Sequence, residues 1–75
     1  MIQEQIIEIF SNFLYIEPDE IDAETNIFAT YDFNDEDIND IIDEFNNTFE
    51  IEIKKTEFME SESIQEMAEY IENLM

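Results

Sequence analysis

The feature that most constrains the fold is the segment 33–49, where apolar and acidic residues follow the period of an α-helix. Five apolar side chains share one helical face: Ile38, Ile41, Ile42, Phe45 and Phe49. Four acids form an acidic strip on the opposite face: Asp37, Asp40, Asp43 and Glu44. Asn34 or Asp35 is expected to cap this helix, since both side chains accept hydrogen bonds from a first turn. A helix over about 35–49 is therefore the framework for the rest of the fold.

Two further helices are predicted. The segment 2–15 should form a helix that ends before Pro18, because the residue before a proline is disfavoured in a helix. Its apolar face holds Ile2, Ile6, Ile9, Phe10, Phe13 and Leu14. Near the C-terminus, Ser63 and Glu66 have the spacing of a capping box. The apolar face that follows is made of Ile64, Met67, Ala68, Ile71 and Leu74.

The segments between these helices are harder to assign. Residues 16–34 are expected to be a long loop, because their apolar residues are too sparse for a helix and too irregular for a strand. Residues 50–54 alternate like a strand but have no strand to pair with, so an extended connector is expected. Residues 56–60 should form one helical turn, with Phe58 and Met59 packed inward. The chain has no glycine, so left-handed positions at helix ends are expected at Asn46, Asn47 and Asn73.

These elements predict an all-α fold, a bundle of three main helices plus one short helix with a long first loop. A single domain is expected over residues 1–75, near the lower size limit for folding without disulfides or metals. A hydrophobic content of 44% supplies apolar area for a small core. The expected core is Ile6, Phe10, Phe28, Ile41, Ile42, Phe45, Ile64, Met67 and Ile71. We expect a monomer.

The net charge limits the partners of the chain. Two basic residues stand against 22 acidic ones, which gives a formal charge of −20. Bare nucleic acid and anionic membrane surfaces should repel such a chain, so its partners should present basic patches. No apolar run has the length of a membrane span, and no cleavable signal pattern opens the chain. A cytoplasmic protein is the default expectation.

Enzyme chemistry has few residues to draw on. The chain lacks histidine, cysteine and glycine, so neither a nucleophile–base pair nor a glycine-rich phosphate loop can be assembled. We therefore expect a protein that is not an enzyme. Five residues partly follow the spacing of a calcium loop: Asp32, Asn34, Glu36, Asn39 and Asp43. Asp37 takes the place of the required glycine, and Asp43 that of the bidentate glutamate, so no dedicated metal site is expected.

The order and spacing of these elements resemble the acyl carrier protein family over nearly the whole chain. Ile2 to Leu14 is similar to the family's first helix, and Thr25-Asn26-Ile27-Phe28 to its long loop. Residues 41–53 resemble the second helix and its exit, and Ala68-Glu69-Tyr70-Ile71 resembles a Tyr-Ile signature in the last helix. The resemblance implies a carrier of fatty acid or polyketide biosynthesis. Its acidic second helix would dock to basic patches on partners such as a ketosynthase, acyltransferase or synthetase.

The family's cofactor, 4′-phosphopantetheine, is attached to the serine of an Asp-Ser-Leu motif at the start of the second helix. Aligning back from Phe49 places that serine at Asp35, and aligning forward from Phe28 places it at Glu36. Matching Ile38 to the motif's leucine places it at Asp37. All three candidates are carboxylates, and no serine occurs between Ser11 and Ser61. The resemblance implies the cofactor, yet the sequence offers no serine to carry it, so no cofactor is expected.

Several functions remain open at this point. The favoured one is an acidic docking protein that uses Asp37, Asp40, Asp43 and Glu44 and has lost the arm. The domain could also be an ordinary acyl carrier with its serine substituted, or a convergent small acidic bundle. A function of another class is an acidic nucleic-acid mimic that inhibits a DNA- or RNA-binding protein, because the charge is spread over the whole chain.

Overall fold

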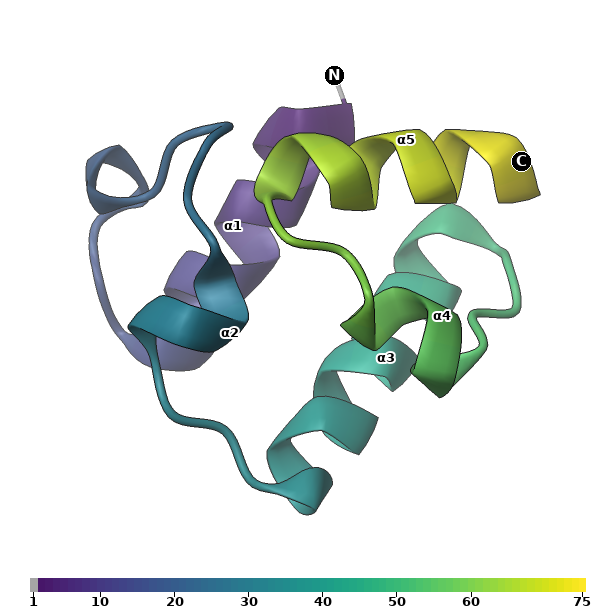
Figure 1. Cartoon of the computed structure of the whole chain (residues 1–75), viewed down its shortest axis with the longest axis horizontal. Helices are drawn as coiled ribbons and strands as arrows, with labels where there is room; N and C mark the ends of the chain where they lie inside the picture. The colour runs from purple at the N-terminus through teal and green to yellow at the C-terminus, as the bar shows by residue number, and fades with distance from the viewer. Residues whose placement is uncertain (1) are drawn as a thin grey trace.

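A computed structural model describes residues 2–75 of the chain. Three long helices, α1 (Ile2–Leu14), α3 (Asp35–Phe49) and α5 (Ile64–Leu74), are joined by segments that contain two short ones (Figure 1). The short helices are α2 (Ile27–Thr30) and α4 (Lys55–Met59), and a 3-10 turn, η1, covers Pro18–Glu20. Residues 2–75 contain no strand. The predicted all-α fold is therefore confirmed.

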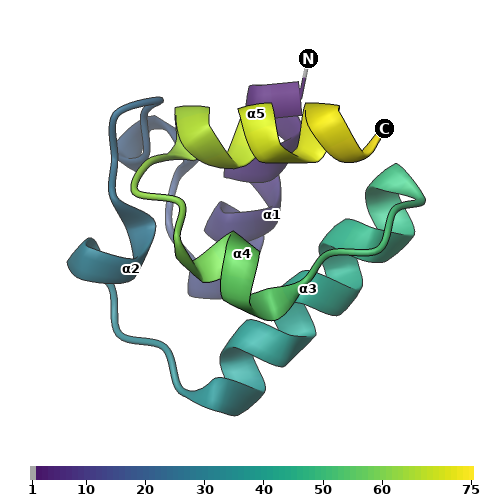
Figure 2. The same cartoon turned by 45° about the vertical axis from the view of Figure 1, so that its right-hand side comes forward.

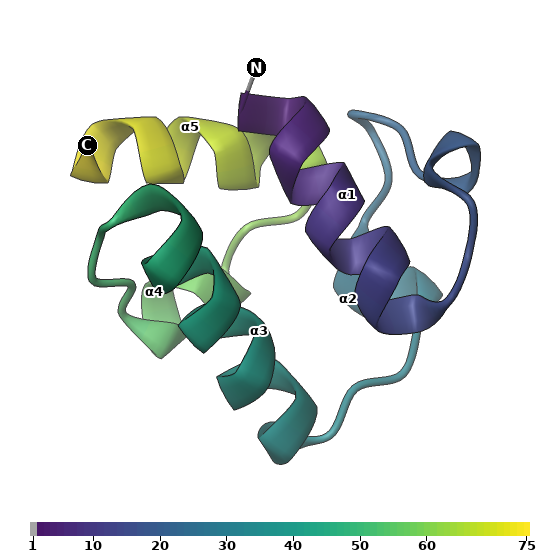
Figure 3. The same ribbon diagram turned by 180° about the vertical axis from the view of Figure 1, so that it is seen from behind.

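Helix α1 is the centre of the packing. It contacts both α5 and α3; in the view from behind its first turns lie at the start of α5, and its axis runs alongside α3 (Figure 3). The short helix α4 lies between α3 and α5 (Figure 2). The predicted core residues are all buried except Phe28, which is partly buried against the others. The apolar face of α3 is buried as its spacing predicted.

All seven phenylalanines of the chain form one connected network of aromatic contacts. Phe10 of α1 meets Phe45 of α3 edge to face, with ring centroids 5.5 Å apart. Phe58 of α4 meets Phe45 at 5.4 Å and Phe28 of α2 at 5.7 Å. Such pairs each contribute about 0.5–1.5 kcal/mol beyond the burial of their area. The network therefore connects the two short helices, α2 and α4, to α1 and α3.

The prediction of a structureless first loop was wrong in part, because residues 16–34 contain η1 and α2. Helix α2 begins where the Asn26 side chain accepts a hydrogen bond from the Ala29 N–H, at 3.3 Å. A helix of four residues is too short to show a period, so the apolar pattern could not reveal it. The rest of the loop is fastened to α5: the Ile64 and Gln65 N–H groups donate to the carbonyls of Thr25 and Ala23, at 3.2 and 3.0 Å. These bonds satisfy first-turn donors of α5 that have no partner inside the helix.

The left-handed positions lie elsewhere than predicted. Tyr15 and Glu50 adopt φ of 59° and 55°, while the asparagines of the prediction all lie within helices: Asn46, Asn47 and Asn73. Just past α1, the Ile16 N–H donates to the Ser11 carbonyl, five residues earlier. Just past α3, the Ile51 N–H donates to the Asn46 carbonyl in the same way. That bond requires a left-handed residue just past the helix, whatever its type. In a chain without glycine a tyrosine and a glutamate therefore occupy these positions.

Two details near the C-terminus also differ from expectation. The Ser63 side chain accepts from the Glu66 N–H as predicted, but the Glu66 carboxylate accepts from the Glu62 N–H, so only half of the predicted capping box forms. Leu74 is 39% exposed, and the apolar face of α5 ends at Ile71.

The short helix α4 begins at Lys55 and buries Phe58, with Met59 partly buried. The connector expected over 50–54 is observed over 51–54, which form no regular secondary structure, while Glu50 takes the left-handed position at the end of α3.

Candidate functional site

The first turn of α3 holds Asp35, Glu36 and Asp37, the three positions at which the sequence resemblance predicted the carrier serine. Asn34 and Asp37 form a reciprocal cap at the start of the helix. The Asp37 N–H donates to the Asn34 side chain at 2.8 Å, and the Asn34 N–H donates to the Asp37 carboxylate at 3.2 Å. Asp35 and Glu36 are exposed, and the Asp35 carboxylate lies 3.6 Å from the Lys55 ammonium. Lys55 therefore pairs with an acid at the start of α3.

The serines of the chain all lie away from this turn. Ser11 is buried in α1, where its hydroxyl donates to the Glu8 carbonyl at 3.0 Å. Ser61 is buried between α4 and α5, and Ser63 caps α5. The side chains of the first turn of α3 are Asp35, Glu36 and Asp37. No serine hydroxyl is therefore available at the start of this helix.

The acids of the acidic strip on α3 do not all border the same groove. Asp40, Asp43 and Glu44 are exposed, and Asp37 is partly buried. Asp37, Asp40 and Glu44 border a groove between α3 and α1, while Asp43 is not among the residues that line it. Asp37, Asp40 and Glu44 are spaced about one helical turn apart, so they lie along the same edge of α3. Asp43 lies at a different angle around the helix axis. Sequence spacing alone placed all four acids together.

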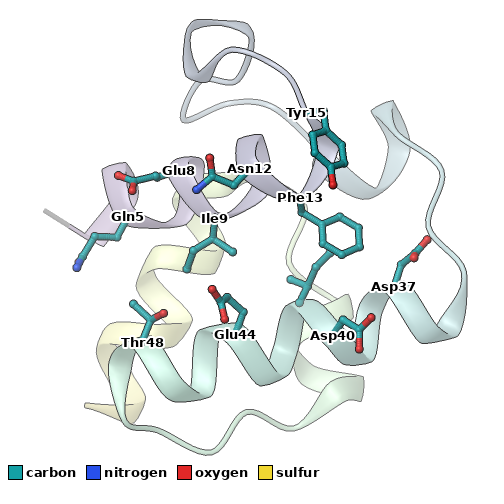
Figure 4. A pocket seen from close by; sticks show the side chains of 11 residues that line it. Gln5, Glu8, Ile9, Asn12, Phe13, Tyr15, Asp37, Asp40, Glu44 and Thr48 are labelled. Atoms are coloured by element: carbon teal, nitrogen blue, oxygen red, sulfur yellow. The ribbon is translucent and has the colours of Figure 1, made fainter.

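The groove between α1 and α3 has a volume of about 880 Å³ and is open to solvent (Figure 4). Ile9 and Phe13 of α1 point toward α3 and form its apolar floor with Ile41. Four acids border it: Glu8, Asp37, Asp40 and Glu44. Tyr15, which is 94% exposed, stands at one end. The sequence did not reveal this groove, although the apolar face of α1 is wider than the core requires.

Comparison with known families decides the type of domain. Residues 4–71 match the family model described as phosphopantetheine attachment site. The chain belongs to the phosphopantetheine attachment site family. A search among curated proteins finds no match. Membership confirms the resemblance to acyl carrier proteins and the expectation of a carrier domain that is not an enzyme.

The family implies attachment of 4′-phosphopantetheine, yet the first turn of α3 does not fit that group. Attachment to a serine joins the cofactor's phosphate to a hydroxyl oxygen, and the side chains at this turn are carboxylates. Two of the three are engaged in structural contacts, Asp35 with Lys55 and Asp37 with Asn34. In this phosphopantetheine attachment domain, the first turn of α3 thus carries side chains that cap the helix.

The space between α3 and α4 is filled by aromatic side chains. Phe58 is fully buried there against Phe45 of α3. Met59 is partly buried against the core and borders a shallow hollow with Phe28 and Ala29 of α2.

The other sites considered from the sequence add little. Within residues 2–75 no three acidic side chains are grouped so that they could hold a metal ion. Among the same residues, no helix is both long enough and apolar enough to cross a membrane. The Tyr70 hydroxyl accepts from the Lys54 N–H at 3.2 Å and donates to the Glu57 carboxylate at 2.9 Å. Tyr70 therefore joins α5 to α4.

Proposed function

We propose that this carrier-family domain is an acidic docking protein without a 4′-phosphopantetheine arm. It binds basic patches on enzymes of acyl or peptidyl assembly, such as a ketosynthase, acyltransferase or synthetase, and serves as a scaffold, regulator or decoy. The observation that supports this most directly is the combination on one helix of carboxylates in the first turn and exposed acids beyond it. A shuttle needs the arm, whereas docking needs only the surface.

The electrostatics favour this partner class. Asp40, Asp43 and Glu44 present negative charge on α3, and the domain as a whole carries −20. A charge of this size attracts basic surfaces from a distance and gives fast association that weakens as salt rises. The same charge opposes pairing of two copies, so the functional unit is proposed to be a monomer, with the cytoplasmic setting expected from the sequence.

The test is affinity capture at low salt from a lysate of the source organism, with identification of the captured proteins by mass spectrometry. The docking variant is Asp40→Lys/Asp43→Lys on α3. The matched control is Glu69→Lys/Glu72→Lys on α5, which changes the net charge equally at exposed positions. Capture of an acyl or peptidyl assembly enzyme by the wild type and the α5 variant, but not by the α3 variant, is expected.

Two other outcomes would contradict the proposal. Equal capture by both variants would make the acidic strip an ordinary solvated face. Capture of a nuclease, polymerase or repressor that duplex DNA displaces would make the domain a nucleic-acid mimic, since docking to an assembly enzyme should not compete with DNA. Circular dichroism of both variants checks that their helices are intact.

A further inference from the structure

We propose that the groove between α1 and α3 receives an amphipathic helix of the partner, with an apolar ridge and basic flanks. The inference rests on the proposed function, because it names the structural element through which a basic partner is held. It extends the docking surface from α3 to α1, whose residues neither the sequence nor the family resemblance assigned to binding.

The floor of the groove is apolar and accessible. Ile9 and Phe13 are only partly buried, although they lie beside the fully packed core of α1, and Ile41 closes the floor from α3. Tyr15 extends this surface at one end, where its ring is almost fully exposed. Its left-handed backbone turns the chain away from α1 and leaves the ring beside the groove (Figure 4). An occupant with apolar side chains would remove this area from water.

The rim of the groove selects a cationic occupant. Glu8 borders the groove from α1, and Asp37, Asp40 and Glu44 border it from α3. The two lysines of the chain, Lys54 and Lys55, do not line it. Lysine or arginine on both flanks of an apolar ridge would therefore complement it. A second copy of this chain is a poor occupant, because it brings the same charge of −20.

The shape of the groove favours a helix over an extended peptide. It lies between two helices, so a third helix can set its side-chain ridge between them. Residues 2–75 offer no strand edge to which an extended peptide could add. Gln5 to Tyr15 covers about 15 Å along α1, which corresponds to roughly three turns of an occupant helix. Its apolar anchors would recur at every third or fourth position.

The test uses a synthetic amphipathic peptide of leucine and lysine with all leucines on one helical face. A control peptide has the same composition with its leucines distributed around the helix. Binding to the full chain is followed by titration and by NMR shift mapping. The groove variant is Gln5→Lys/Asn12→Lys, and the control is Gln65→Lys/Asn73→Lys, which makes the same replacements at exposed positions of α5. We expect at least a roughly tenfold loss of affinity in the groove variant only.

Tyr15→Asn is a second, independent variant, because asparagine tolerates the left-handed backbone and removes only the exposed ring. It should weaken peptide binding several-fold without lowering stability. Equal losses in the two lysine variants, or equal binding of both peptides, would overturn the groove inference. If an assembly enzyme is lost by Asp40→Lys/Asp43→Lys but kept by Gln5→Lys/Asn12→Lys, the docking function holds and the groove inference fails. If both variants keep it, the docking function itself fails.

Discussion

Asn34 and Asp37 cap the start of α3 reciprocally, each side chain accepting the backbone N–H of the other residue. Two N–H groups that a helix start leaves without partners are satisfied in this way. Asp37 is also one of the three positions predicted for the carrier serine. At this predicted position the side chain takes part in helix capping.

Loss of this cap should destabilise the fold measurably. Asn34→Ala is expected to lower the free energy of unfolding by about 1 kcal/mol, since the Asp37 N–H loses its partner. Asn39→Ala, an exposed position inside the same helix, is the matched control and should be neutral or slightly stabilising. Urea unfolding followed by circular dichroism measures both. Equal losses at the two positions would show that the cap contributes nothing specific.

The left-handed residue after α1 should be a point where stability can be gained. Tyr15→Gly is expected to raise the free energy of unfolding by roughly 1 kcal/mol, because glycine has no Cβ to clash at φ of 59°. The lost side chain is 94% exposed, so little packing is sacrificed. Tyr15→Ala keeps the Cβ and should give no such gain. A comparable gain from alanine in thermal unfolding would mean that the backbone conformation is not the cause.

Alkaline stability should depend on Tyr70. Burial raises the pKa of its hydroxyl above the ordinary value of 10.0, and the Glu57 carboxylate raises it further, while the Lys54 N–H lowers it. The neutral phenol therefore contributes stability that is fully present below pH 10.0 and is lost as the pH rises through the higher folded-state pKa. Tyr70→Phe should lose less stability than the wild type over that range. Parallel losses in unfolding experiments at neutral and alkaline pH would contradict this.

The absence of the arm can be tested chemically. Incubated with coenzyme A and a broad-specificity phosphopantetheinyl transferase, the wild type should gain no mass, because no serine lies on α3. Asp35→Ser, Glu36→Ser and Asp37→Ser restore a hydroxyl at each aligned position in turn. Mass spectrometry of the intact proteins would detect the modification, and a gain in one variant would locate the attachment position. A gain in the wild type would overturn the proposal of an armless domain.

The long helices were predictable because their signals are local. The apolar spacing and the cap at Asn34 define α3 within a few neighbouring residues, and its range of Asp35–Phe49 agrees with the sequence prediction. Helix α2 was missed because four residues show no period. The left-handed positions were missed because they are set by the backbone hydrogen bond that ends each helix. Residue type had less influence, since a tyrosine and a glutamate occupy them.

The sequence by itself determined the three long helices, the apolar side of each, the family resemblance and the absence of serine between Ser11 and Ser61. Each of these depends on residue type at short spacing. Only the tertiary structure decided that Asp37, Asp40 and Glu44 border a groove with α1 while Asp43 does not. It also decided that Phe58 fills the space between α3 and α4. The reason is physical: both features depend on how distant helices pack, and that is set by the fit of many side chains at once.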